Sequence, residues 1–158
     1  MLKKIIEHLK NGGVIVYPTE TAYGLGCDAT NQQAVDLVFK LKKRAKSKTL
    51  PLIAGSLAMV KKYCPMSAIE EKLAKIYWPG ALTMVLKILP DRAKNEKGFF
   101  GLRPQNDRGV AEALAKGIVA KDGTVAVRVS GNKIARKLSQ KLGRPIVSTS
   151  ANLAGEGE

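Results

Sequence analysis

Short apolar runs rich in β-branched residues alternate along this chain with segments of helical periodicity, and this alternation limits the fold more than any other feature. We expect strands at 14–17, 50–54, 82–89, 99–103, 124–129 and 145–147. Helical patterns occupy 2–9, 31–41, 110–118 and 132–142, with Asn31 as an N-cap and Gly143 as a C-terminal stop, and Ser56 and Ser67 have the character of N-caps for two more helices. We expect Leu41 to face inward and residues 18–30 to form a loop. This order predicts an α/β protein, with one twisted mixed sheet and flanking helices. A chain of 158 residues suits a single domain, 1–158.

The charge of the chain is strongly positive and unevenly placed. Lys and Arg number 27 against 13 acidic residues, a net charge of +14. Six cations fall within residues 40–48, and a second group lies between 133 and 144 in a stretch without acidic residues. Such patches attract phosphates, whether on a nucleotide or on nucleic acid. We interpret the 133–144 group as the solvated outer side of a helix, and the 40–48 group as a candidate anion site.

Several classes of protein are excluded or disfavoured by residues that are scarce. The two cysteines, Cys27 and Cys64, form no C-x-x-C pair, which excludes a disulfide scaffold and a zinc ribbon. A single histidine, His8, excludes a multi-histidine metal site, so we predict no metal ligands. The P-loop, the G-x-G-x-x-G fingerprint and the G-x-S-x-G elbow are all absent. No apolar run approaches the roughly 20 residues of a membrane span, and we expect a cytoplasmic protein with no membrane partner.

Residues 18–26 (PTETAYGLG) form the first of three segments that could carry chemistry. They follow an expected strand, where the ligand crevice of an open α/β sheet usually lies. Threonine hydroxyls, a carboxylate and a phenol can hydrogen-bond a polar ligand, and the glycines permit close approach of the backbone. The alternative is a purely structural turn with Tyr23 in the core. Composition alone does not decide between the two.

The second segment is Lys42-Lys43-Arg44, with Lys48 beyond it. A non-helical turn at this point could direct Lys42 and Arg44 at one polyphosphate, although cations at a helix C-terminus also simply offset the helix dipole. The third segment, residues 148–152 (STSAN), groups three hydroxyls and an amide after a short strand. It could bind a ligand or form only a Ser/Asx turn.

Together these segments resemble the YrdC-like family, the threonylcarbamoyl-AMP synthases, across most of the chain. The matches are residues 18–26 with P-T-E-T-x-Y-G-L-G, Lys42 and Arg44 with K-x-R, residues 78–83 with W-P-G-x-L-T, and Ser150 and Asn152 with S-x-N. The resemblance implies a concave, basic cavity. It also implies condensation of L-threonine, bicarbonate and ATP, with Mg²⁺, into threonylcarbamoyl-AMP and pyrophosphate. Downstream threonylcarbamoyl-transferase proteins would then pass the group to adenosine 37 of tRNA (the t6A modification).

The same resemblance implies roles for particular residues. ATP would be held by Lys42, Arg44, Lys48, Thr83, Ser150 and Asn152. Threonine would be held by Thr21, Lys87 and Ser148, with Lys87 opposite the amino-acid carboxylate. The residues identify no general base, so no catalytic residue is assigned. Carbamate formation and adenylation depend mostly on positioning and charge stabilisation, which a histidine-poor basic site can supply.

The chain departs from the family pattern at several points. Ala45 replaces a proline after K-x-R, and Ser130 replaces the proline of R-x-P after Arg128. The segment 90–122 is basic and is longer than the corresponding segment of the family pattern. Family members continue beyond S-A-N-x-[SA]-G with a segment that helps to close the site, whereas this chain ends at Glu158. We therefore expect a domain that lacks that closing segment.

Two other functions remain open at this stage. A non-catalytic RNA-binding or ribosome-maturation module could use the basic cavity to hold tRNA or double-stranded RNA. It would read shape and phosphates, because aromatic residues for base stacking are only 5% of the chain. A carbamoyl-adenylate domain of the hydrogenase-maturation type is the other alternative, although such domains normally belong to much longer chains.

Overall fold

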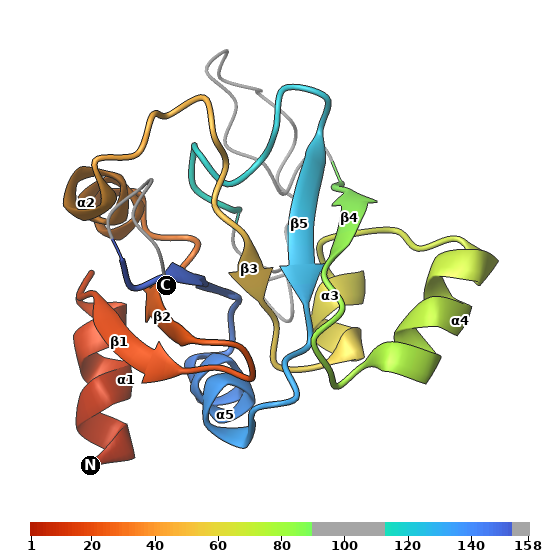
Figure 1. Ribbon diagram of the computed structural model, residues 1–158, viewed down its shortest axis with the longest axis horizontal. Coiled ribbons are helices and arrows are strands. Elements are labelled where there is room, and N and C mark those ends of the chain that lie inside the picture. The colour runs from red at the N-terminus through yellow and green to blue at the C-terminus, as the bar shows by residue number, and fades with distance from the viewer. Residues whose placement is uncertain (90–112, 153–158) are drawn as a thin grey trace, which may run out of the picture.

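The strands form two small sheets in the computed structural model, which describes residues 1–89 and 113–152 (Figure 1). One sheet has the order β1-β2-β7 and the other β4-β5-β3-β6. The strands are β1 Ile15–Pro18, β2 Tyr23–Gly26, β3 Leu52–Ile53, β4 Met84–Lys87, β5 Thr124–Arg128, β6 Ile146–Val147 and β7 Thr149–Ser150. β3 and β5 are parallel and the other pairs antiparallel, which confirms the predicted mixed α/β architecture. Only Ser148 separates β6 from β7, so the two sheets meet at that point.

Three of the helices begin at the N-caps predicted from the sequence, Asn31, Ser56 and Ser67. The helices are α1 Leu2–Lys10, α2 Gln32–Lys42, α3 Leu57–Lys61, α4 Ala68–Tyr77 and α5 Lys133–Leu142. Asn31, Ser56, Ser67 and Asn132 each accept a backbone N–H at a helix start, and Ser67 forms a full capping box with Glu70. Gly143 ends α5 at φ 77°, the left-handed conformation that favours glycine.

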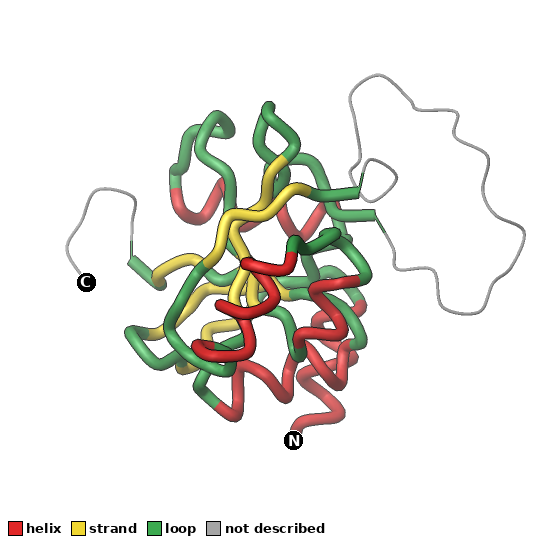
Figure 2. The backbone as a smooth tube through the Cα atoms, turned by 90° about the vertical axis from the view of Figure 1, so that its right-hand side faces the viewer, coloured by secondary structure: helices red, strands yellow, loops and turns green. Residues whose placement is uncertain are grey.

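The hydrophobic core has two parts. The larger lies around β3, β4 and β5 and includes Val35, Leu86 and Val127. The smaller joins α1 to α5 through residues such as Leu9 and Leu138. Figure 2 shows the strands running through the middle of the molecule, with helices in front of them and below them. No helix in the two described ranges is long and apolar enough to cross a membrane.

Three local predictions differ from the structure. Residues 18–30 are not all loop, because Tyr23–Gly26 pairs with Ile15–Pro18 as a hairpin. Residues 113–118 form a turn rather than part of a helix, and backbone bonds from Ala115 N to Ala29 O and from Leu50 N to Gly117 O tie this turn to its neighbours. Leu41, expected to face inward, is half exposed. The strand expected at 99–103 lies outside the described residues.

Candidate active site

A pocket of about 160 Å³ lies where the two sheets meet. Its walls are the β1–β2 hairpin, the residues around β7, the start of β3, Thr83, and the end of β5. The lining residues are Thr19, Thr21, Ala22, Tyr23, Gly24, Pro51, Leu52, Thr83, Arg128, Ser148, Thr149 and Ser150. Four predicted site residues, namely Thr21, Thr83, Ser148 and Ser150, are therefore brought together. Of the lining residues in the described ranges, Arg128 alone carries a charge.

Thr19 shapes the hairpin wall. Its Oγ1 donates to Ala22 O at 2.6 Å and accepts from the backbone N–H groups of Thr21 and Ala22, both at 3.3 Å. This side-chain turn places Thr19 and Thr21 on the pocket side. Tyr23 also lines the pocket and is 65% exposed, so the interpretation of Tyr23 as a core residue is wrong.

Tyr17 and Gly26 hold the hairpin against β6. The Tyr17 hydroxyl donates to Val147 O at 2.9 Å from a fully buried ring. A Cβ at Gly26 would lie 2.4 Å from Val147 O and 2.5 Å from the Tyr17 ring, so only glycine allows this approach. Gly26 of the PTETAYGLG segment thus lets the backbone of β2 approach the backbone of β6.

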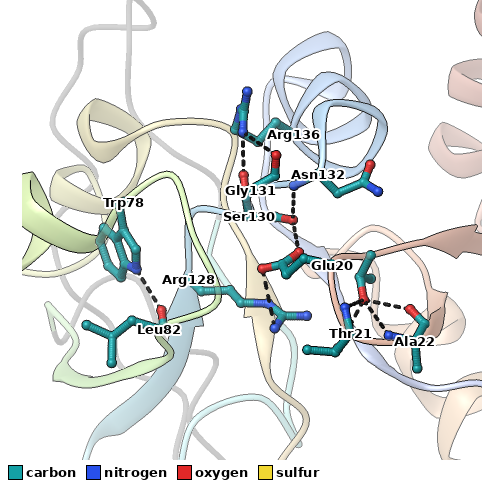
Figure 3. A network of polar contacts seen from close by, with 11 residues as sticks. Glu20, Thr21, Ala22, Trp78, Leu82, Arg128, Ser130, Gly131, Asn132 and Arg136 are labelled. Carbon is teal, nitrogen blue, oxygen red and sulfur yellow. Dashed lines mark hydrogen bonds and ion pairs between the residues drawn. The ribbon is translucent and has the colours of Figure 1, made fainter.

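Arg128 ends β5 at the pocket and pairs with Glu20 from the hairpin turn (Figure 3). Arg128 Nη1 lies 3.6 Å from Glu20 Oε1, and both side chains are largely buried. The other carboxylate oxygen of Glu20 accepts a hydrogen bond from the Ser130 hydroxyl. Burial alone would raise the pKa of Glu20, but the Ser130 hydroxyl, backbone N–H groups and Arg128 together hold it below its ordinary value. Glu20 is therefore a carboxylate beside the guanidinium at neutral pH.

The turn that carries Thr83 forms the opposite wall. The Trp78–Pro79 bond is cis, and the Trp78 indole Nε1 donates to Leu82 O at 2.7 Å. Gly80 N donates to Val129 O at 2.8 Å, which attaches this turn to the end of β5. The W-P-G-x-L-T segment is thus a structural support that presents Thr83 to the pocket.

Lys42 is buried and joins the end of α2 to the chain after β7. Its ammonium group donates to Ser150 O at 2.7 Å, to Asn152 Oδ1 at 3.1 Å and to the backbone oxygen of Asn152. Burial, and secondarily the charge of Arg44, lowers the pKa of Lys42. The structure therefore brings three predicted ATP ligands, Lys42, Ser150 and Asn152, into one cluster.

Arg44 and Lys48 lie beyond the end of α2. Lys43 has φ 49°, so the predicted non-helical turn is present. The Arg44 guanidinium binds backbone carbonyls of the segment that follows, since its Nε donates to Lys48 O at 3.1 Å and its Nη2 donates to Thr49 O at 2.9 Å. Lys48 is exposed and does not line the pocket.

Lys87 lies toward the other end of the β4–β5 pair from the pocket. It pairs with Thr124 at the first residue of β5, whereas Arg128 is the last, about 13 Å away along the strand. Its ammonium group donates to Asp122 O at 2.6 Å, and Lys87 is not among the lining residues. The structure thus does not bring Lys87 to Thr21 and Ser148. Strand direction places Arg128, rather than Lys87, at the edge where the ligand crevice lies.

Sequence reasoning did not single out Arg128 for the site. It named the hydroxyl of Thr19 and the carboxylate of Glu20 only as possible ligand contacts, whereas Thr19 closes the hairpin turn and Glu20 pairs with Arg128. Arg128 stood out only as part of R-x-P, although a cation at the carboxyl end of an expected strand could have suggested it. The structure also limits the chemistry. Cys27 and Cys64 are buried, and burial raises the pKa of each thiol to about 12, so neither acts as a thiolate near neutral pH. Among the described residues, no cluster of His, Cys, Asp and Glu could hold a metal ion.

The fold and the pocket define an α/β protein with a hydroxyl-lined pocket that contains one arginine among its described lining residues. The model of the Sua5/YciO/YrdC family, described as "Telomere recombination", matches residues 7–109 and 102–158. The chain belongs to this family.

Its relatives include a threonylcarbamoyl-AMP synthase from Vibrio vulnificus, 35% identical over 99% of this chain and 74% of the relative. A threonylcarbamoyl-AMP synthase from Pseudoalteromonas translucida is 38% identical over 96% of this chain and 71% of its own length. The crystal structure of P. abyssi Sua5 complexed with L-threonine matches with a TM-score of 0.78 at 30% identity. That match covers 98% of this chain and 39% of the P. abyssi chain.

Proposed function

We propose that this chain condenses L-threonine, bicarbonate and ATP into threonylcarbamoyl-AMP and pyrophosphate, as a nucleotidyltransferase. The observation that carries the proposal is the pocket itself, in which hydroxyls of the 18–26 and 148–152 segments surround the Arg128 guanidinium. Support comes from relatives named threonylcarbamoyl-AMP synthase and from a related structure that holds L-threonine.

L-Threonine fits this pocket through its carboxylate. Arg128 offers planar N–H donors that match a carboxylate, and its loose pairing with Glu20 does not consume them all. Thr21 and Ser148 lie on the same lining and can hydrogen-bond the ammonium or hydroxyl group of the amino acid. Arg128 thus takes the place that the resemblance gave to Lys87.

ATP would extend from the pocket toward the end of α2. Thr83 and Ser150 line the pocket, while Lys42 and Asn152 form the adjoining cluster. Arg44 and Lys48 follow it along the chain and would meet the phosphates farther out. Mg²⁺ would arrive with the triphosphate as part of the substrate, since the described residues offer no carboxylate or histidine cluster of their own for it.

The chemistry needs positioning more than a strong base. The threonine amine combines with bicarbonate to give a carbamate and water, and a carbamate oxygen then attacks the α-phosphorus of ATP. The P–O bond to the β-phosphate breaks and pyrophosphate leaves. Cations near the phosphates stabilise the charge that builds up on them, and the bound reactants are held for in-line attack. The product would pass in the cytoplasm to downstream threonylcarbamoyl-transferase proteins that modify tRNA.

The direct test is pyrophosphate release from ATP by the purified chain with Mg²⁺, bicarbonate and L-threonine. We expect release that requires both threonine and bicarbonate, with threonylcarbamoyl-AMP as the product in mass spectrometry. No threonine-dependent release would overturn the proposal. Use of carbamoyl phosphate without threonine would instead indicate the hydrogenase-maturation type of domain. Salt-sensitive RNA binding that persists at saturating ATP, without turnover, would indicate the RNA-binding module.

A further inference from the structure

Ser130 is a fully buried serine whose hydroxyl connects α5 to the hairpin turn (Figure 3). Its Oγ donates to Glu20 Oε2 and accepts from Asn132 N at 3.1 Å. Arg136 fixes the same segment, since its Nη1 donates to Ser130 O at 2.6 Å and to Gly131 O at 3.0 Å. The first turn of α5 therefore holds the Ser130 hydroxyl in one place.

Glu20 lies behind Arg128 rather than in the pocket. Its neighbours Thr19 and Thr21 line the pocket, but Glu20 is not a lining residue. Within the described part of the chain, Glu20 Oε1 is buried without a hydrogen-bond partner and forms a 3.6 Å ion pair with Arg128. The hydrogen bond from Ser130 to the other oxygen thus decides how the carboxylate faces the guanidinium.

We propose that Ser130, acting through Glu20, sets the orientation in which Arg128 receives the carboxylate of its amino-acid ligand. Ser130 and Glu20 are then positioning residues, and Arg128 is the group that touches the ligand. The inference rests on the proposed function, because it assigns the ligand of Arg128. It gives a role to the serine that stands in this chain where the family pattern has proline.

The loose geometry of the pair is what this role requires. A tight two-bond contact between Glu20 and Arg128 would occupy two of the five guanidinium donors. A single contact at 3.6 Å anchors one edge of the guanidinium and leaves the others for a ligand. An unanchored arginine would lose side-chain entropy when the ligand binds, so anchoring it beforehand favours binding.

The test compares Ser130→Ala with Ser139→Ala. Both serines are fully buried, and Ser139 Oγ donates to Arg144 O at 2.7 Å, away from the pocket. We expect Ser130→Ala to raise the KM for L-threonine on the order of fivefold, with the KM for ATP within about twofold of wild type. Ser139→Ala should leave both KM values within about twofold of wild type. It should lower the melting temperature about as much as Ser130→Ala does. Titration calorimetry with L-threonine provides the same comparison without turnover.

Glu20→Gln is the second variant, and it keeps the test valid if Ser130→Ala does not fold. The neutral amide cannot form the ion pair with Arg128, so we expect the KM for threonine to rise on the order of tenfold. The double variant Glu20→Gln with Ser130→Ala should have the same KM for threonine as Glu20→Gln alone, because Ser130 acts through Glu20. Fully additive losses would contradict this route.

A pH profile adds a readout that a merely structural role would not change. Among the described residues, the charged or titratable groups facing Glu20 are Arg128 and the Tyr17 phenol; burial raises the pKa of the phenol, so it stays neutral. The Ser130 hydrogen bond favours the charged form of Glu20. Ser130→Ala should therefore move the acidic limb of kcat/KM for threonine to higher pH, and Ser139→Ala should not.

The outcomes separate the inference from the proposed function. If wild type shows no threonine-dependent turnover, the proposed function fails. If wild type is active and Ser130→Ala matches Ser139→Ala in both KM values and in the acidic limb, the positioning role is overturned while the function stands.

Discussion

Two arginine–carboxylate pairs flank α5, and they are built differently. Arg144 Nη1 lies 2.7 Å from Oδ2 of Asp28, whose side chain is 1% exposed, and Asp28 Oδ1 accepts from the backbone N–H and the hydroxyl of Thr30. Arg128 Nη1 lies 3.6 Å from Glu20 Oε1, an oxygen with no hydrogen-bond partner among the described residues. The first carboxylate is fully satisfied by the protein, whereas the second is held from one side only.

The difference is the one we expect between a structural pair and a pair whose arginine binds a ligand, as we propose for Arg128. A fully satisfied buried carboxylate ties the chain before β6 to the chain before α2 and has nothing left to offer a ligand. A loosely paired arginine at the rim of a pocket keeps donors free for an anion. Charge alone would have placed the ligand site at the cation-rich 40–48 segment. None of the pocket's described lining residues comes from that segment.

Arg144→Ala should produce the largest effect, on stability. It leaves the buried Asp28 carboxylate without its cation, which costs about 3 kcal/mol of unfolding free energy. Urea denaturation measures the loss, and the folded enzyme should keep its KM for threonine. A loss below about 0.5 kcal/mol, the range of an ordinary surface change, would show that this pair is not structural.

Arg128→Ala should come next, on activity. Losing a charged, donor-rich ligand contact should lower kcat/KM for threonine by about 100-fold, close to 2.7 kcal/mol, with a smaller change in stability than Arg144→Ala. Steady-state pyrophosphate release measures it. The control is Lys87→Ala, which should stay within about twofold because Lys87 contacts Asp122 rather than the pocket. Equal losses of kcat/KM in Arg128→Ala and Lys87→Ala would show that Lys87 also contributes to the threonine site.

Arg44→Ala extends the comparison to the cation-rich segment. The guanidinium is engaged by two backbone carbonyls, and its replacement should weaken ATP binding by about 2 kcal/mol if Arg44 also meets a phosphate. Calorimetric titration with ATP measures the change. Lys137→Ala, on the exposed face of α5, is the control and should leave ATP binding almost unchanged. The same loss from both would mean that charge acts diffusely and that no specific phosphate ligand lies at Arg44.

The smallest expected effect is the pH dependence that Glu20 adds to stability. The folded-state pKa of Glu20 lies below its ordinary value of 4.5, so its stabilising contribution is complete above that value and is lost as pH falls through the folded pKa. Thermal unfolding of wild type and Glu20→Gln across pH 3–7 should give curves that differ near neutrality and converge at low pH. A constant difference at all pH values would contradict a charged Glu20.

Local rules predict part of this molecule well. Caps at Asn31, Ser56 and Ser67 and the glycine stop at Gly143 depend on a few neighbouring residues, and all are confirmed. The pairing of β2 with β1, by contrast, depends on the turn that Thr19 closes, and the buried turn at 113–118 depends on contacts with distant backbone. Neither feature has a local sequence signal strong enough to override the loop expected at 18–30 or the helical pattern at 110–118.

The site shows the same division. Thr21, Thr83, Ser148 and Ser150 were predicted from motifs and lie together at the pocket. Lys87 and Arg128 could not be ranked from the sequence, because which end of the β4–β5 pair faces the pocket depends on the strand register. The Glu20–Ser130 contact joins residues 110 positions apart, a distance no local pattern spans.

The central claim is that Arg128, rather than the richer group of cations at 40–48, receives the carboxylate of L-threonine. A crystal structure of the chain with L-threonine and ATP tests it most directly. We expect the threonine carboxylate within hydrogen-bond distance of the Arg128 guanidinium, with Thr21 and Ser148 beside it. A carboxylate bound at Lys87 or at residues 40–48, with Arg128 free of ligand, would contradict the account.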